Sequence, residues 1–270
     1  MGRVLDDAHL LGRLEHLALA AGCEIMAVYE AGIDVEHKAD ASPVTEADRR
    51  AEAVILAGLR ESFPGIACVA EEECSAGLLP PALGDVFFLV DPLDGTKEFI
   101  SRRPDFTVNI ALVSAGVPIA GVVFAPAQGI LYAGYRNEAW EVEITPRGEM
   151  LDRRPIQVRA HPTNPVIVAS RSHRTPETDV FIADHPGAEI VSIGSSLKFC
   201  LLASGKADLY PRFGRTMEWD TAAGDAVLRA AGGSMRNVDG SAFVYGKRNQ
   251  PHDADFANPW FVATGAAAAR

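Results

Sequence analysis

The segment from Val90 to Phe99, which reads VDPLDGTKEF, has residue types and spacing suited to binding a cation. Asp91 and Asp94 lie three positions apart on a turn stiffened by Pro92, so their carboxylates can converge on one point. The Leu93 carbonyl lies between them and adds a third oxygen. Because hard cations such as Mg²⁺ prefer oxygen ligands, this segment predicts a divalent-cation site.

Gly95 and Thr96 follow directly and favour phosphate binding beside such a cation. Gly95 allows the backbone to approach a ligand closely, and Thr96 adds a hydroxyl and an amide where a helix or turn can begin. An Asp-Gly pair is also one of the commonest turn signals, so Asp94-Gly95 alone is typical of an ordinary loop. Acidic groups elsewhere in the chain are what favour a site.

Two further acidic groups occur far from this turn. Glu71 ends an apolar run together with two more glutamates, and Asp220 opens an Ala-rich stretch. A solvated acidic loop explains one or two of these glutamates, and a helix cap explains Asp220. Acids from three segments would repel one another without a cation, so their convergence would indicate a metal.

Other candidate residues surround these acids in the sequence. Asp48 lies in or near the first turn of a predicted helix that Ser42 or Thr45 can cap, where an acid usually interacts with the helix dipole. Candidates for substrate binding precede or follow a later predicted helix, where amides, hydroxyls and positive charges can bind a ribose or a phosphate. They are Gly194, Ser195, Ser196, Lys198 and Arg212, although a helix cap explains Ser195 and a surface position explains Arg212 equally well.

Hydrophobic periodicity predicts the elements that must position these residues. Helices are expected over 10–29, after Thr45, and over 175–183, 195–203 and 219–231. Strands are expected over 66–69, 86–90, 106–113, 118–124, 130–135, 166–169 and 190–193. The order predicts a layered α+β or α/β protein with two sheets. We expect an N-terminal lobe over 1–145, with a helix pair, an antiparallel sheet and the main metal site, and a C-terminal α/β lobe over 146–270 with substrate-binding elements.

Composition limits the classes of function. The 270 residues include 25 Lys and Arg against 36 Asp and Glu, a formal charge of −11 without a basic cluster, which argues against binding a nucleic acid polymer. An anionic substrate would therefore need a bound cation. The four cysteines form no paired motif, and no signal peptide or membrane-spanning run is evident. We expect a cytoplasmic protein, with peripheral attachment to the cytoplasmic face of the inner membrane left open.

Several other chemistries lack their motifs. The chain has no P-loop, no G-x-S-x-G elbow around Ser170 or Ser172, and no paired histidines with zinc spacing. His173 can approach a substrate, but a lone histidine is usually structural or solvated.

The arrangement of motifs resembles the inositol monophosphatase superfamily of Mg²⁺-dependent, lithium-sensitive phosphatases, from about Ala18 to Gly233. The matching motifs are PVTEAD at 43–48, Glu71-Glu72, DPLDGT at 91–96 and WDTAAG at 219–224. Three further segments resemble the CysQ branch, the 3′(2′),5′-bisphosphate nucleotidases: KEF at 97–99, GSSLKFC at 194–200 and LYPRFG at 209–214. Inositol-selective members usually have Thr-Asn-Phe after the Gly-Thr pair, and this chain does not.

The resemblance implies an α-β-α-β-α sandwich of the inositol monophosphatase and fructose-1,6-bisphosphatase type. It implies that two or more Mg²⁺ ions grip the scissile phosphate, that Gly95 and Thr96 bind its oxygens, and that Thr96 with Asp48 activates the attacking water. Glu71 is a competing candidate for that activation. The implied metal ligands are Glu71, Asp91, the Leu93 carbonyl, Asp94 and Asp220, the last of which also contacts the substrate.

The resulting expectation is a monomeric or homodimeric phosphomonoesterase that converts adenosine 3′,5′-bisphosphate to AMP and phosphate, a housekeeping step in sulfate assimilation. An inositol or sugar phosphate phosphatase with the same metal site is the enzymatic alternative. A cation- or phosphate-binding regulator without turnover is the alternative from another class.

Overall fold

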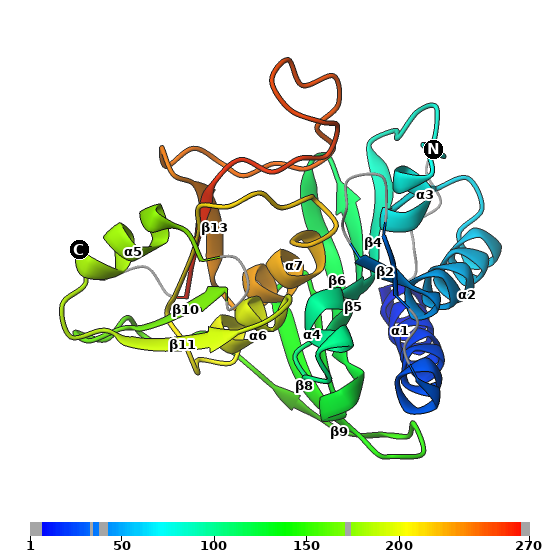
Figure 1. Cartoon of the computed structure of the whole chain (residues 1–270), viewed down its shortest axis with the longest axis horizontal. Helices are drawn as coiled ribbons and strands as arrows, with labels where there is room; N and C mark the ends of the chain where they lie inside the picture. Colours follow the sequence, from blue (N-terminus) through cyan, green and yellow to red (C-terminus); the bar gives the residue numbers. More distant parts are fainter. Residues whose placement is uncertain (1–6, 33–34, 38–42, 171–173, 266–270) are drawn as a thin grey trace.

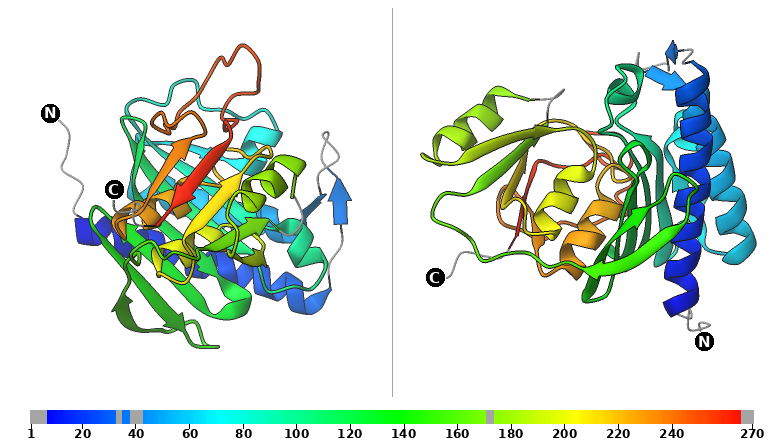
Figure 2. Two further views of the ribbon diagram at one scale, coloured as in Figure 1. Left: turned by 90° about the vertical axis from the view of Figure 1, so that its left-hand side faces the viewer. Right: turned by 90° about the horizontal axis from the view of Figure 1, so that it is seen from below.

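The computed structural model describes residues 7–32, 35–37, 43–170 and 174–265. Its elements form five layers: two helices, a seven-stranded sheet, two more helices, a five-stranded sheet and one outer helix (Figures 1 and 2). The predicted α-β-α-β-α sandwich is confirmed.

The larger sheet has the strand order β3-β4-β5-β6-β7-β8-β9. Strands β3 and β4 are parallel, and every later neighbour is antiparallel, so the predicted meander is present. The strands are β3 (Ala67–Ala70), β4 (Val86–Asp94), β5 (Thr107–Ser114), β6 (Val117–Ala125), β7 (Ile130–Tyr135), β8 (Glu138–Ile144) and β9 (Met150–Pro155). Strand β9 pairs with β8 although it lies beyond residue 145, where we expected the first lobe to end.

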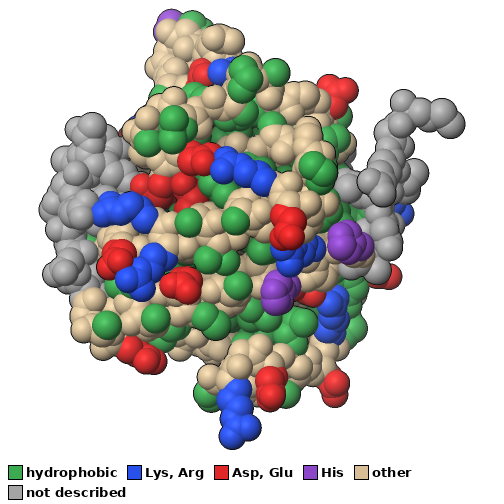
Figure 3. Space-filling view, turned by 90° about the vertical axis from the view of Figure 1, so that its right-hand side faces the viewer, with side chains coloured by type: hydrophobic (Ala, Val, Ile, Leu, Met, Phe, Trp, Pro, Cys, Tyr) green, Lys and Arg blue, Asp and Glu red, His purple; other side chains and the backbone are tan. Residues whose placement is uncertain are grey.

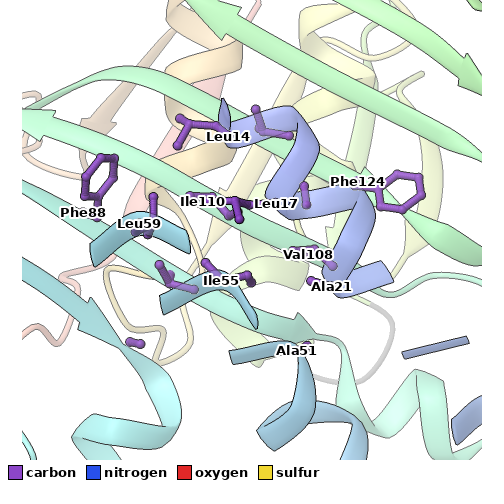
Figure 4. Packing of buried hydrophobic residues seen from close by; sticks show 14 of the residues in the cluster. Leu14, Leu17, Ala21, Ala51, Ile55, Leu59, Phe88, Val108, Ile110 and Phe124 are labelled. Carbon is purple, nitrogen blue, oxygen red and sulfur yellow. The ribbon is translucent and has the colours of Figure 1, made fainter. Parts of the chain in front are cut away.

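Helices α1 (Asp7–Ala31) and α2 (Glu46–Ser62) cover one face of this sheet. Leu14, Leu17 and Ala21 of α1 point toward the strands together with Ala51, Ile55 and Leu59 of α2 (Figure 4). Alternate residues of β5 share this core, because side chains along a strand alternate between its two faces. Val108 and Ile110 belong to this cluster, and Ala111 belongs to the cluster on the opposite face.

Helices α6 (Leu197–Ala203) and α7 (Ala222–Ala230) cover the opposite face. Small residues let α7 lie very close to the sheet: a Cβ atom at Gly121 of β6 would come within 2.5 Å of the Ala223 carbonyl oxygen. Both helices begin later than we expected, at 197 rather than 195 and at 222 rather than 219. The candidate residues Ser195, Ser196 and Asp220 therefore lie in the turns that precede the helices.

The smaller sheet has the order β11-β10-β12-β14-β13, and α5 (Pro176–Ala183) lies outside it, capped by Thr175. Its strands are β10 (Val166–Ser170), β11 (Glu189–Ile193), β12 (Leu209–Arg212), β13 (Ser234–Asn237) and β14 (Phe261–Thr264). Strands β12, β13 and β14 were not predicted, and neither were β8 and β9 of the larger sheet. Short elements also occur at β1 (Val35–His37), β2 (Pro43–Thr45), α3 (Glu71–Ser75), α4 (Thr96–Ile100) and a 3-10 turn, η1 (Pro126–Gln128).

On the side of the molecule where α1 and α2 lie, acidic and basic side chains are interspersed over the surface (Figure 3). Within the described residues, every helix is too short or too polar to cross a membrane.

Candidate active site

The cation-site turn is a break in the pairing of β4 with β5. The register shifts between Asp91 and Asp94, and the Leu93 amide donates to Asp91 Oδ1 at 3.0 Å. Gly95 follows with a φ of +94°, and a Cβ atom there would lie 3.0 Å from the Asp105 carbonyl oxygen. Glycine is therefore required both by the left-handed backbone and by the close approach of the next segment.

Thr96 begins α4, and its hydroxyl lies 3.4 Å from Asp48 Oδ1 and 3.3 Å from the Leu93 carbonyl oxygen. The other oxygen of Asp48 accepts hydrogen bonds from the Thr45 amide at 2.7 Å and the Thr45 hydroxyl at 2.6 Å. Thr45 is therefore the cap of α2, whereas the alternative cap, Ser42, lies outside the described residues. Asp48 is both a capping residue and a partner of Thr96.

Parallel pairing of β3 with β4 brings Glu71 beside the turn. Ala70 is paired with Val90, so the residues that follow, Glu71 and Asp91, emerge at the same edge of the sheet. Burial raises the pKa of Asp91 well above its usual value, and the nearby Glu71, Asp94 and Asp220 carboxylates raise it further. Acids from three distant segments therefore interact at one place.

Asp220 reaches the same place from the turn before α7. Burial raises its pKa to about 8, and the charges of Asp94 and Glu71 act in the same direction. Its Oδ2 atom accepts a hydrogen bond from the Met217 amide at 2.8 Å, which holds the carboxylate in the turn.

The predicted metal ligands fit a hard divalent cation by their chemistry. All are oxygen donors, and burial together with the neighbouring carboxylates raises the pKa of Asp91 and Asp220, so a cation bound among these acids would relieve their repulsion. A compact group of three or more His, Cys, Asp or Glu side chains ready to hold a metal is not formed by the described residues. The Glu71 and Asp91 carboxyl groups hydrogen-bond to each other instead. Assignment of individual ligands stays a prediction.

Asp94 has polar partners that connect it to the other half of the molecule. The Ser196 hydroxyl lies 3.0 Å from Asp94 Oδ2 and 2.8 Å from the Asp220 carbonyl oxygen. Burial raises the pKa of Asp94, whereas Lys198, Ser196 and Asn109 oppose that rise. Asn109 was not predicted, although an amide inside the apolar run TVNIALV was a usable signal.

These residues border a cavity of about 770 Å³ between the two sheets. Its lining includes most of the predicted site residues: Glu71, Asp91, Leu93, Asp94, Gly95, Thr96, Gly194, Ser195, Lys198, Arg212 and Asp220. Among the described residues, Asp48 and Ser196 do not line it. They lie behind Thr96 and Asp94, so they can act through those residues.

Basic side chains of α6 and the smaller sheet, Lys198 and Arg212, line the cavity. Lys198 is buried and donates to the Ser195 carbonyl oxygen at 2.5 Å. Burial lowers the pKa of Lys198 to about 8 despite the nearby Asp94 carboxylate. Arg212 donates to the Arg215 carbonyl oxygen at 3.0 Å, and its buried Nε atom has no partner among the described residues. Arg215 also lines the cavity and was not predicted.

The turn before α6 is tightly built. A Cβ atom at Gly194 would meet the Asp105 carbonyl oxygen at 2.7 Å, and Ser195 adopts a positive φ of 49°. Ser196, rather than Ser195, is the cap residue of α6. A residue other than glycine in this backbone region is strained, and such strain is concentrated at functional sites. His173 lies outside the described residues.

Glu52 is a third residue that the sequence did not reveal. Its carboxylate accepts hydrogen bonds from the Glu72 amide at 2.8 Å and the Glu73 amide at 2.9 Å. Burial raises its pKa to about 7. Because these amides form the first turn of α3, Glu52 fixes the start of the helix that carries Glu71.

A layered sandwich with acids from three segments beside a cavity of about 770 Å³ is the arrangement of a metal-dependent phosphatase. The sequence profile of the inositol monophosphatase family matches residues 6–269. The chain belongs to that family.

Individual relatives cover nearly the whole chain. A 3′(2′),5′-bisphosphate nucleotidase CysQ from Escherichia coli O157:H7 is 45% identical over 93% of this chain and 98% of its own length. The crystal structure of CysQ from Bacteroides thetaiotaomicron has a TM-score of 0.77 and 36% identity, covering 98% of this chain and 100% of that one. An inositol monophosphatase from Anabaena (Nostoc) sp. PCC 7120 has a TM-score of 0.72 and 25% identity, covering 96% and 91%.

Proposed function

We propose that this chain is a Mg²⁺-dependent 3′(2′),5′-bisphosphate nucleotidase that hydrolyses adenosine 3′,5′-bisphosphate to AMP and phosphate. The observation that carries the proposal is a single cavity lined by acids at the β4 turn and by Lys198, Arg212 and Arg215. Acids suit the cations of a phosphatase, and further positive groups suit a substrate with a second phosphate. The 45% identity to a protein of that name supports this substrate class.

The metal would be held by Glu71, Asp91, the Leu93 carbonyl, Asp94 and Asp220. Bound there, Mg²⁺ would offset the negative charge that develops on the phosphoryl group and make water more acidic. The chain supplies these carboxylates from three segments; Asp91 is buried, and Glu71, Asp94 and Asp220 are half-buried at the cavity wall. The Gly95 and Thr96 amides, at the start of α4, bind the phosphate oxygens.

Thr96 and Asp48 form the pair that accepts a proton from the attacking water. The Thr96 hydroxyl can pass a proton to Asp48 Oδ1, which lies 3.4 Å away. The Asp48 carboxylate is held in place by the two hydrogen bonds from Thr45 to its other oxygen. A fixed carboxylate beside a hydroxyl is a suitable general base, with Glu71 as the competing candidate.

The remaining cavity residues bind the nucleotide. Gly194, Ser195 and Ser196 form the turn that faces the ribose, with Ser196 acting through Asp94. Arg212 offers its unpaired Nε atom to the second phosphate, and Lys198 adds charge beside it. An arginine suits phosphate because its planar donors can bind two oxygens at once.

The proposed role is clearance of adenosine bisphosphate during sulfate assimilation, by a monomer or homodimer in the cytoplasm. All four cysteines are free thiols, as is usual in a reducing compartment.

The test compares substrates with one preparation of the protein. We expect Mg²⁺-dependent phosphate release with kcat/KM for adenosine 3′,5′-bisphosphate well above that for inositol 1-phosphate. Asp94→Asn should abolish release while the protein stays folded, as judged by its circular dichroism spectrum. A preference for inositol 1-phosphate would assign the chain to the inositol-selective members, and binding without release would assign it a regulatory role.

A further inference from the structure

Asn109 is a buried amide in the middle of the larger sheet, at a position the proposed chemistry does not use. It lies in β5 directly opposite Asp91 and is 1% exposed. Its neighbours in the strand, Val108 and Ile110, are fully buried apolar residues. A polar side chain here needs an explanation, because burying an amide is unfavourable unless its hydrogen bonds are made.

The amide nitrogen makes two contacts, one for each of its protons. It lies 3.0 Å from Ser196 Oγ and 3.3 Å from Asp94 Oδ2. The Ser196 hydroxyl lies within reach of two acceptors, Asp94 Oδ2 at 3.0 Å and the Asp220 carbonyl oxygen at 2.8 Å. Since Asn109 donates to Ser196, the single proton of that hydroxyl is directed to Asp94 or to the Asp220 backbone.

The other end of the amide makes no compensating bond. Asn109 Oδ1 is buried and has no hydrogen-bond partner among the described residues. Turning the amide over would place this oxygen against the Asp94 carboxylate and the Ser196 oxygen, so the observed orientation is the favourable one. An apolar side chain of similar size would serve packing better than an amide with an unpaired oxygen.

We propose that Asn109 is a positioning residue that, through its contacts with Ser196 and Asp94, holds the Asp94 carboxylate in the orientation that binds the catalytic cation. The inference rests on the proposed function, because it takes Asp94 as a metal ligand. It also gives a role to Ser196, which connects the β5 side of the site to the turn before α6. Residues that orient metal ligands usually change metal affinity when they are replaced.

The test uses two substitutions and a matched control in the same strand. Asn109→Leu keeps the number and branching of the side-chain heavy atoms and removes both donors, and Asn109→Asp keeps the shape and replaces the donors by an acceptor. Thr107→Val is the control: Thr107 is on the same face of β5, is fully buried, and its hydroxyl has no partner among the described residues. The three measurements are the rise in melting temperature with Mg²⁺, the Mg²⁺ concentration that gives half-maximal phosphate release, and KM at saturating Mg²⁺.

We expect both Asn109 variants to need roughly 10-fold more Mg²⁺ for half-maximal release and to show a smaller Mg²⁺-induced rise in melting temperature. At saturating Mg²⁺, KM for adenosine 3′,5′-bisphosphate should stay within about 3-fold of the unsubstituted protein, and Thr107→Val should match that protein in all three measurements.

Unchanged Mg²⁺ dependence in both Asn109 variants, with or without a lower melting temperature, would overturn the inference and leave Asn109 a packing role. Failure of both variants to fold would overturn it as well. An unsubstituted protein that binds Mg²⁺ but releases no phosphate would overturn the proposed function alone, because the thermal measurement would still report on Asp94. An unsubstituted protein that does not respond to Mg²⁺ would overturn both.

Discussion

Asp48 performs two tasks because its two carboxylate oxygens face different partners. Oδ2 completes the capping box of α2 with Thr45, and Oδ1 lies near the Thr96 hydroxyl. The capping interaction is the ordinary use of an acid at a helix start. It also fixes the rotamer of Asp48, so the helix cap provides the rigid carboxylate that the proposed proton transfer needs.

Thr96→Val tests that transfer. The substitution keeps the shape of the side chain and removes the hydroxyl, so we expect kcat to fall by about 100-fold or more with a small change in KM. Thr96→Ser retains the hydroxyl and should keep kcat within about 10-fold of the original value. Steady-state kinetics at saturating Mg²⁺ measure both. Equal kcat values for the two variants would show that the hydroxyl does not participate.

At the scale of elements, the close contact of α7 with β6 determines where Asp220 lies. Because Gly121 has no side chain and the facing residues of α7 are small, the helix lies closer to the sheet than larger side chains would allow. The turn that carries Asp220 precedes α7 directly, so the depth at which α7 packs sets the distance from Asp220 to the β4 turn.

Gly121→Ala tests this dependence. Its Cβ would lie 2.5 Å from the Ala223 carbonyl oxygen and 2.7 Å from the Ala226 side chain, so α7 must shift outward. We expect a loss of about 1–3 kcal/mol in the free energy of unfolding and weaker Mg²⁺ binding. Gly12→Ala is the control, because a Cβ there meets nothing within 4 Å. It should be neutral or stabilise by up to about 1 kcal/mol, since alanine favours a helix. Urea unfolding of both variants provides the comparison.

At the scale of the whole molecule, the two halves of the chain share one core around α6 and α7. Phe87 and Val123 of the larger sheet belong to the same buried cluster as Phe261 of the smaller sheet. A buried polar group lies within this region: Asp225 of α7 accepts hydrogen bonds from Arg229 at 2.8 Å and from the Tyr245 hydroxyl at 3.1 Å. Burial raises the pKa of Asp225 from 3.8 to about 6 in spite of Arg229.

This buried acid should make the stability of the fold depend on pH. The folded state holds the Asp225 proton more tightly than the unfolded state, so the free energy of unfolding should fall as pH rises from 3.8 to about 6. The contribution of this one group is at most about 3 kcal/mol. Asp225→Asn cannot titrate, so the difference in stability between the two proteins should change across that pH range. A constant difference from pH 4 to pH 7 would contradict the shift.

Periodicity predicted much of the fold because the long elements bury one face. The apolar residues of α1 and α2 repeat at helical spacing, and the strands over 107–135 are apolar runs bounded by turn residues, so each was predicted within a few residues. Strands β8 and β9 were missed because charged residues interrupt their apolar pattern, and β12 to β14 because they are short and pair with strands distant in the sequence. The late starts of α6 and α7 were missed because Ser195 and Asp220 look like helix residues, whereas the backbone forms turns there.

The sequence alone determined which side chains are available: a run of acids and glycine after a strand, two more acidic groups and a few cations. Their types dictate oxygen-ligand and phosphate chemistry wherever they meet. Only the tertiary structure decided that they do meet, because parallel pairing of β3 with β4 and the depth of α7 are long-range contacts that local pattern does not encode. Other long-range contacts revealed Asn109 and Glu52, whose roles depend on partners many residues away.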